Sequence, residues 1–260
     1  MITLTTDFGY SESFAGQMKG VILSMAPDAL IIDITHGIRA HDVSAAALSV
    51  SSSYRYFPEG TVHVAVVDPG VGSSRAPMIL NACEHYFVGP DNGIFTLVKL
   101  GCPEASAWRI RPEGVELRSP GSTFHGRDLF APVAARLELG EFPSAHCEPM
   151  EGMVMLPFPE PLREGDSLVG EVIHVDVFGN AITNIRAEDM AALRNGAGSL
   201  LVAEAAGNSC PLVHYYAEAV SGPHCLVNSD GRLEIFLFEK SAAGALGLAP
   251  GSHVRVTVDI

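Results

Sequence analysis

The sequence predicts two domains of different fold class joined by a linker. Up to about residue 150, strand-like runs alternate with helical segments, which is typical of an α/β domain with a mostly parallel central sheet flanked by helices. Beyond residue 166, short β-prone runs follow one another between turn signals, as in an all-β barrel. Five prolines between Pro143 and Pro161 separate the two patterns. We therefore expect an N-terminal α/β domain over 1–150, a proline-rich linker over 151–165 and a C-terminal β-barrel domain over 166–260.

Local signals predict the elements of the first domain. The run 62–67 is apolar and rich in valine, which indicates a strand buried on both faces. Similar runs predict strands at 2–6, 30–34, 78–82 and 86–88. Serine at the start and proline after the end favour a helix over 13–25, and Asp42 is expected to cap a helix over 42–52. Two more helices are expected over 92–100 and 129–139.

The second domain is expected to consist of short strands. Turn signals such as Phe178-Gly179-Asn180 and Ser229-Asp230-Gly231 separate the β-prone runs. These runs fall at 169–177, 181–185, 199–203, 211–216, 224–228, 233–238 and 254–259. So many short strands in so few residues favour a small closed barrel or a sandwich.

The charge balance restricts the partners of this chain. Its 260 residues carry 30 acidic against 16 basic side chains, a net charge of −14. Such a surface repels phosphate backbones and anionic lipids, so neither nucleic acid nor a membrane is expected as a partner. No apolar run reaches the roughly 18–20 residues that span a bilayer, and the first residues contain no basic leader.

The cysteines indicate a reducing compartment. The five are dispersed without CxxC spacing, which argues against a disulfide framework and against a zinc site. We therefore expect a cytoplasmic protein without a metal centre. His36 and His41 could suggest a metal pair, but isolated loop histidines are more often satisfied by backbone groups.

The segment Val64–Arg75 contains the first candidate for chemistry. The buried strand ends at Asp68, and Arg75 follows across the glycine-bearing loop Pro69-Gly70-Val71-Gly72. Ligands of α/β sheets bind at the carboxyl ends of the strands, where such loops gather polar groups. An acid and a guanidinium placed there can form a charge pair around a small polar reactant, although a simple strand-end acid beside a solvated Arg is the commoner arrangement.

A second segment supplies the missing acid–base group. His125 lies in Thr123-Phe124-His125-Gly126-Arg127-Asp128, just before a predicted helix, and Asp7 follows the first predicted strand. Carboxylate, guanidinium and imidazole together can position a water molecule and tune its proton. Arg127 and Asp128 are expected to pair with each other and orient the His125 loop. The chain contains no GxSxG, Walker A, HExxH or strand-borne GxGxxG motif.

Eight motifs are spread along nearly the whole chain. They are Thr5-Thr6-Asp7-Phe8-Gly9, Ile32-Asp33-Ile34-Thr35-His36, Tyr56-Phe57-Pro58-Glu59-Gly60-Thr61-Val62, Val67-Asp68-Pro69-Gly70-Val71-Gly72, Gly89-Pro90-Asp91-Asn92-Gly93, Phe124-His125-Gly126-Arg127-Asp128, Asp176-Val177-Phe178-Gly179-Asn180 and Asn228-Ser229. In this order and spacing they resemble one known family, the adenosine-forming S-adenosyl-L-methionine (SAM) hydrolases, or SAM hydroxide adenosyltransferases, relatives of the fluorinase and chlorinase.

The resemblance implies a reaction and an assembly. SAM would be hydrolysed to adenosine and L-methionine by in-line attack of an activated water or hydroxide on C5′ of the ribose, without metal or cofactor. The family's Asp–Arg–His set falls on Asp68, Arg75 and His125. A homotrimer is implied, with each substrate between the N-terminal domain of one subunit and the C-terminal domain of its neighbour.

The resemblance also assigns substrate contacts. Asp7 would hold the ribose diol, Asp176 the ammonium of the methionine portion and Ser229 its carboxylate. Asn180 would recognise adenine, while Phe178 and Tyr216 would pack against the base. Asp230 and the bulky segment 236–240 depart from the family pattern, and an acid beside Ser229 weakens the carboxylate assignment.

Two other functions remain open at this point. A SAM-dependent halogenase would use the same substrate with a halide as nucleophile, but a carboxylate at Asp68 repels a halide, and the halogenases carry Tyr there. A non-catalytic SAM or adenosine sensor has no use for a complete acid–base set. Chlorinated product in the presence of chloride would favour the halogenase, and SAM binding without adenosine release would favour the sensor.

Overall fold

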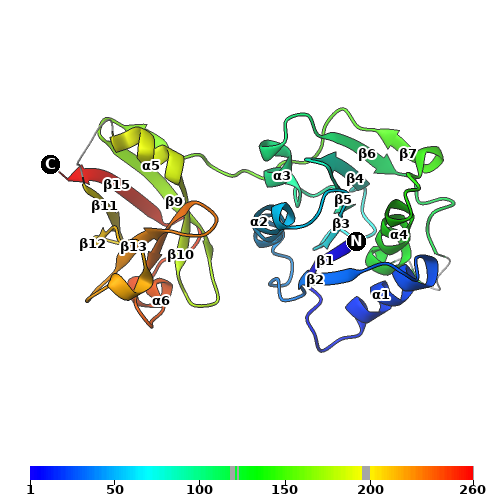
Figure 1. Cartoon of the computed structure of the whole chain (residues 1–260), viewed down its shortest axis with the longest axis horizontal. Coiled ribbons are helices and arrows are strands. Elements are labelled where there is room, and N and C mark those ends of the chain that lie inside the picture. The colour runs from blue at the N-terminus through cyan, green and yellow to red at the C-terminus, as the bar shows by residue number, and fades with distance from the viewer. Residues whose placement is uncertain (118–120, 122, 195–199, 260) are drawn as a thin grey trace. The chain divides into compact units, whose positions relative to one another are not determined.

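The computed structural model describes residues 1–117, 121, 123–194 and 200–259 (Figure 1). The chain divides into two compact units, Met1–Leu156 and Pro157–Ile260. The division falls inside the stretch expected to be a linker. Each unit has its own buried apolar core.

The first unit is built on a seven-stranded sheet with the order β2-β1-β3-β5-β4-β6-β7. The pairings among β2 (Ile31–Thr35), β1 (Ile2–Thr6), β3 (Val62–Val66) and β5 (His85–Pro90) are parallel. The remaining three strands, β4 (Pro77–Ala82), β6 (Ser106–Ile110) and β7 (Cys147–Pro149), pair antiparallel. The sheet is therefore mixed rather than mostly parallel, because a hairpin joins β4 to β5 and the two strands after it continue that antiparallel edge.

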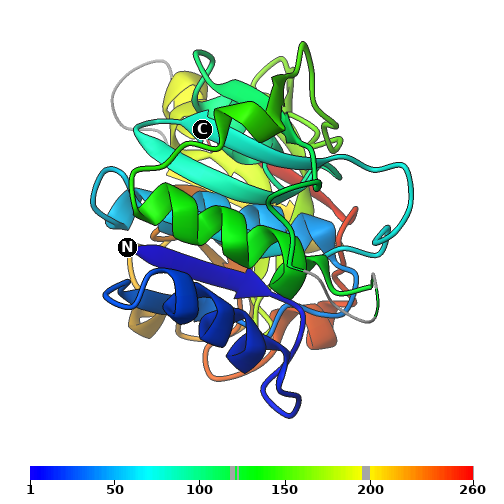
Figure 2. The same cartoon turned by 90° about the vertical axis from the view of Figure 1, so that its right-hand side faces the viewer.

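Helices cover both faces of this sheet (Figure 2). One core lies between the sheet and α1 (Phe14–Met25) with α4 (Ala131–Glu138), and it contains Val64 and Val66 of β3. The other core contains Ala65 and Val67 with residues of α2 (Val43–Ser53) and α3 (Thr96–Gly101). Successive residues of β3 thus alternate between two cores, which explains why the strand is apolar without interruption. Asp42 caps α2 as expected, accepting a 2.9 Å hydrogen bond from the backbone N–H of Ala45.

The second unit is an almost closed antiparallel barrel. Its main path is β12 (Asn208–Pro211), β11 (Leu200–Ala205), β15 (His253–Asp259), β9 (Ser167–Val175), β10 (Ala181–Arg186), β14 (Arg232–Phe236) and β13 (His224–Val227), and β8 (Leu162–Glu164) pairs with β9 beside it. A bridge between Leu212 and Cys225 brings the two ends of this path together.

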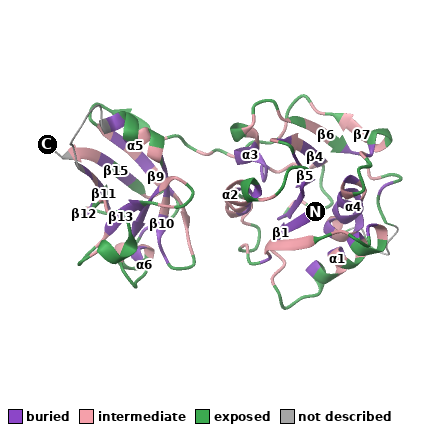
Figure 3. Cartoon of the chain, in the orientation of Figure 1, coloured by how far each residue is buried: buried purple, intermediate pink, exposed green. Residues whose placement is uncertain are grey.

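The expectation of an all-β second domain needs correction, because α5 (Ala187–Arg194) and α6 (Ala242–Leu246) are helices. Figure 3 shows that the buried residues of both units lie mainly on strands and helices, whereas many of the loops are exposed. None of the helices among the described residues is long and apolar enough to cross a bilayer.

Candidate active site

The predicted polar residues of the first unit follow parallel strands at one edge of the sheet. Thr6 of β1 pairs with Val66 of β3 in parallel register, so Asp7 and the Val67-Asp68 step leave the sheet at the same edge. β5 ends there too, and Asn92 after it donates a 2.8 Å hydrogen bond to the Val67 carbonyl. Gly89 lets β5 pass this close, because a Cβ there would lie 2.3 Å from the Ala65 carbonyl oxygen. The sheet thus gathers the loops that carry the candidate residues.

Asp68, Arg75 and His125 are in direct contact. Arg75 forms a two-point ion pair with Asp68, with Nε 3.0 Å from Oδ1 and Nη2 bonded to Oδ2. The same Nη2 lies 2.7 Å from Nδ1 of His125. A guanidinium can only donate, so Nδ1 accepts this hydrogen bond and the imidazole proton resides on Nε2. The three side chains predicted from separate segments therefore form one hydrogen-bonded group.

One nitrogen of the Arg75 guanidinium, Nη1, is left available to donate. Its side chain is 9% exposed and that of Asp68 is 6% exposed, and the guanidinium carbon lies 5.5 Å from the centre of the Phe130 ring. Nη1 is buried and has no hydrogen-bond partner among the described residues. A buried unpaired N–H is costly unless water or a ligand accepts from it. Arg75 is thus oriented by two neighbours and can donate to a third group.

The electrostatics keep His125 neutral. Burial, and next the positive charge of Arg75, lowers the pKa of His125 below its ordinary value, against smaller opposing effects of nearby carboxylates. A neutral imidazole is the form that can accept from Arg75. The local charge pattern therefore maintains the hydrogen bond at neutral pH.

The loop that carries His125 is held as expected. Arg127 and Asp128 pair through Nε–Oδ1 at 2.6 Å and Nη2–Oδ2 at 2.9 Å. Arg127 also donates from Nη1 to Oε1 of Gln17 on α1 at 2.8 Å. Gly126 begins the π-helical turn Gly126–Phe130, and a Cβ there would come within 2.9 Å of the Phe124 ring. These contacts fix the position from which His125 extends to Arg75.

Asp7 is anchored by backbone of the loop after β2. Its Oδ2 accepts a 2.9 Å hydrogen bond from the N–H of His41. His41 has a φ of +68°, an uncommon conformation for a residue other than glycine.

Among the described residues, no group of three or more His, Cys, Asp or Glu side chains is arranged to hold a metal ion.

The second unit contains the other predicted residues. Asp176, Tyr216 and Ser229 line one cavity of about 390 Å³. Phe178 and Asn180 belong to the turn that follows β9, where Asp176 Oδ1 accepts from both backbone N–H groups at 2.9 and 2.8 Å. The side chain of Asn180 is buried and donates to Asp176 Oδ2 at 3.1 Å, whereas Phe178 is 75% exposed.

Glu234 is a site residue that the sequence did not indicate. It lines the same cavity, is 3% exposed, and accepts from the Tyr216 hydroxyl at 2.7 Å and from Asn228 Nδ2 at 3.2 Å. Burial raises its pKa despite these hydrogen bonds. The sequence offered no signal for it, because side chains alternate along a strand and a charged residue between Leu233 and Ile235 is the usual pattern of a solvent-facing position.

Comparisons with known proteins show which family this chain resembles along its length. Profiles for the SAM hydroxide adenosyltransferase N-terminal and C-terminal domains match residues 2–147 and 170–255. An (R)-S-adenosyl-L-methionine hydrolase from Methanocaldococcus jannaschii is 37% identical over 95% of this chain and 92% of its own. A fluorinase from Nocardia brasiliensis is 27% identical over 99% of this chain and 97% of its own.

A solved structure has the same fold throughout. The crystal structure of an uncharacterized conserved protein from Thermotoga maritima matches with a TM-score of 0.91 at 31% identity, covering 99% of this chain and all of that one. The architecture described above is therefore shared along the entire length. With both domain profiles matched and with full-length relatives above 30% identity, the chain belongs to the SAM hydroxide adenosyltransferase family.

Proposed function

We propose that this protein hydrolyses SAM to adenosine and L-methionine. The observation that carries the proposal is the contact of Asp68, Arg75 and His125 at the carboxyl edge of the sheet, with one Arg75 nitrogen left to donate. Relatives named as SAM hydrolases are more similar to this chain than those named fluorinases, at 37% against 27% identity. The carboxylate at Asp68 also disfavours a halide nucleophile.

The proposed step is an in-line displacement. A water oxygen forms a bond to C5′ of the ribose while the bond from C5′ to sulfur breaks, and the electron pair leaves with sulfur as the neutral thioether of methionine. Arg75 Nη1 orients the attacking water and favours its hydroxide character. Asp68 accepts the released proton through a lone pair that Arg75 does not use. His125 holds Arg75 in place through Nδ1. Because the sulfonium is already a good leaving group, we propose that no cofactor or metal takes part.

The substrate contacts are proposed from the resemblance together with the positions above. Asp7 binds the ribose diol, Asp176 the ammonium and Ser229 the carboxylate of the methionine portion. Asn180, Phe178 and Tyr216 recognise adenine, the last two by packing against its faces. We propose a homotrimer in which the N-terminal unit of one subunit and the C-terminal unit of its neighbour enclose each substrate. All five cysteines are free thiols, which fits a cytoplasmic protein. The net charge of −14 supports the proposal that neither nucleic acid nor a membrane is a partner.

Incubation with SAM in ¹⁸O-labelled water tests this function. Mass spectrometry should find the label on the 5′ oxygen of adenosine and unlabelled methionine as the second product. The Asp68→Asn variant is the control and should release far less adenosine. Chloride-dependent formation of 5′-chloro-5′-deoxyadenosine would instead support the halogenase. SAM binding without adenosine release would support the sensor and contradict hydrolysis.

A further inference from the structure

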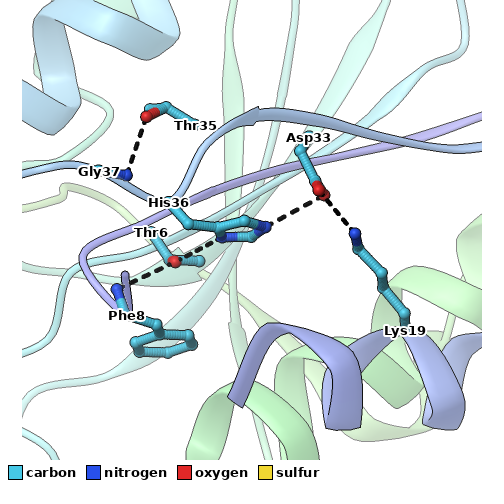
Figure 4. Close-up of polar contacts among 7 residues, drawn as sticks. All are labelled: Thr6, Phe8, Lys19, Asp33, Thr35, His36 and Gly37. Atoms are coloured by element: carbon cyan, nitrogen blue, oxygen red, sulfur yellow. Dashed lines mark hydrogen bonds and ion pairs between the residues drawn. The ribbon is translucent and has the colours of Figure 1, made fainter. Parts of the chain in front are cut away.

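A series of partly buried polar contacts runs from Lys19 to Thr6 and Phe8, the two residues on either side of Asp7 in the sequence (Figure 4). Lys19 Nζ of α1 donates to Oδ2 of Asp33 at 2.6 Å, and Oδ1 of Asp33 lies 3.1 Å from Nε2 of His36. His36 Nδ1 is 2.8 Å from the hydroxyl of Thr6, which accepts a 3.2 Å hydrogen bond from the Phe8 N–H. The series therefore ends on the two residues that flank Asp7 in the sequence.

The hydrogens of the Thr6 hydroxyl and of His36 Nε2 can both point toward Asp33. The Thr6 hydroxyl accepts from Phe8, so its own hydrogen is available for Nδ1 of His36. The imidazole then carries its proton on Nε2, facing the Asp33 carboxylate. Burial tends to raise the pKa of Asp33, but the contacts with Lys19 and His36 outweigh burial and lower it. The link between His36 Nε2 and Asp33 Oδ1 is a 3.1 Å electrostatic contact rather than a hydrogen bond, because neither atom has a hydrogen-bond partner among the described residues.

His36 also holds the Asp7 segment through its backbone. Its carbonyl accepts a 2.8 Å hydrogen bond from the N–H of Gly9. Five residues further along, the N–H of His41 donates to the Asp7 carboxylate. The loop after β2 thus fixes the residues on both sides of Asp7 and the carboxylate itself. His36 contributes two of these contacts, and its side chain is 1% exposed.

We propose that His36 is a positioning residue for the ribose subsite. It acts through Thr6 and the backbone of residues 7–9 to keep the Asp7 carboxylate aimed at the ribose diol, and Lys19 and Asp33 hold its ring in place. The inference rests on the proposed function, because that function assigns the ribose to Asp7. It predicts that loss of the His36 imidazole weakens ribose binding. The hydrogen bonds among Asp68, Arg75 and His125 should stay unchanged.

The same strand offers a matched control. At the other end of β1, the Thr3 hydroxyl lies 2.8 Å from Nδ1 of His63, and His63 is also 1% exposed. His63 Nε2 faces His85 Nδ1 at 3.4 Å. Both histidines therefore bridge a β1 threonine to another side chain from a buried position. They differ in that His36 lies beside Asp7, whereas His63 is at the far end of the sheet.

The experiment compares His36→Gln with His63→Gln by calorimetric titration of adenosine and by SAM kinetics. His36→Gln should weaken adenosine binding about tenfold and raise KM for SAM similarly, the size expected when the half-buried carboxylate of Asp7 loses its orientation, with kcat within about twofold. His63→Gln should change neither by more than about twofold. In an Asp7→Asn background, His36→Gln should add little, because the group that it positions has already been altered.

Several results separate this inference from the proposed function. Equal effects of the two Gln variants on adenosine binding, or full additivity with Asp7→Asn, would overturn the positioning role even if SAM is hydrolysed. Wild-type protein that binds adenosine without hydrolysing SAM would refute the proposed function, while the binding comparison still tests His36. If His36→Gln does not fold, Lys19→Met replaces it. The Lys19 side chain is 35% exposed, and its loss should weaken adenosine binding about threefold. An unchanged adenosine affinity in Lys19→Met would contradict the proposal that the contacts from Lys19 to Thr6 position Asp7.

Discussion

Nη2 of Arg75 lies 2.7 Å from Nδ1 of His125, a residue 50 positions further along the chain. The same nitrogen also bonds to Asp68, so one arm of the guanidinium joins an acid and an imidazole. The other arm, Nη1, has no partner among the described residues. Nη2 of Arg75 therefore holds the side chain in place, while Nη1 is available to donate, and the first two predictions follow from this difference.

Arg75→Lys should reduce kcat by about a hundredfold to a thousandfold, the effect of losing a preorganised donor at the reacting group. A lysine ammonium cannot hold Asp68 at two points, reach His125 and still present a third donor. Adenosine affinity should change little. Arg111→Lys is the matched control, because Arg111 forms a surface ion pair with Glu148 and is half exposed. Steady-state kinetics of both variants check this, and an Arg75→Lys enzyme with near-normal kcat would contradict it.

Activity should have an acid limb set by His125. Its folded-state pKa is lowered, so the ring is neutral at pH 7 and gains a proton only as the pH falls below the ordinary value near 6.5. Protonated Nδ1 cannot accept from Arg75, so kcat/KM should fall through that lowered pKa. His125→Gln retains an acceptor that does not titrate and should flatten this limb, although its rate is lower. A pH profile from 4 to 8 checks the prediction, and identical acid limbs in the two proteins would refute it.

Stability in acid should depend on His63. Burial, and secondarily His85, lowers the pKa of His63 to about 3. Between about 6.5 and 3 the unfolded chain binds a proton that the folded protein excludes. The free energy of unfolding therefore decreases as pH falls through this range, and His63 contributes on the order of 2–3 kcal/mol to the loss by pH 4. Urea unfolding at pH 7 and pH 4 should show a smaller decrease for His63→Gln. An equal decrease would show that other groups determine acid stability.

The buried carboxylate of Glu234 gives a prediction for the second unit. Tyr216→Phe removes a 2.7 Å hydrogen bond to Glu234 and should cost about 1.5–3 kcal/mol of unfolding free energy at neutral pH. Glu234→Gln keeps an acceptor for Tyr216 and removes the buried charge, so it should cost less. Denaturant titration of both variants checks this order. The opposite order would mean that the charge itself contributes to folding.

Part of this site could be predicted because strand signals are local. Alternating burial makes the Val62–Val67 run continuous and apolar, and the run ends on Asp68 whatever the rest of the chain does. Parallel pairing then places Asp7 at the same edge. The contact of Arg75 with His125 is different, since no local pattern specifies which loops meet across 50 residues. The acid–base chemistry of the three side chains suggested that grouping, the resemblance to a family implied the same set, and the structure brings the side chains together.

The errors have physical causes. Residues 211–216 are β-prone, yet β12 ends at Pro211, and Tyr216 lies in a short helical turn from which it reaches Glu234. Tertiary contact outweighed strand propensity there. No bounds were predicted for β6, because Ser106–Ile110 is largely unburied and lacks an apolar run. The helix α5 has a weakly amphipathic sequence directly after a strand, so nothing in its periodicity distinguished it from a loop.

Gly89 and Gly16 should respond oppositely to alanine. A Cβ on Gly89 would lie 2.3 Å from the Ala65 carbonyl oxygen, and backbone in a central strand cannot move aside, so Gly89→Ala should cost about 1–3 kcal/mol or more. The change should also disturb Val67 and Asp68 next to it, lowering kcat. Gly16 is exposed on α1, and an alanine methyl group there would have open space around it, so Gly16→Ala should stabilise by about 0.5–1 kcal/mol through helix propensity. Thermal melting of both variants, with kinetics for Gly89→Ala, measures the contrast. A Gly89→Ala protein as stable as the wild type would show that β3 and β5 can separate without loss, and that the close approach of these strands does not constrain the Asp68 loop.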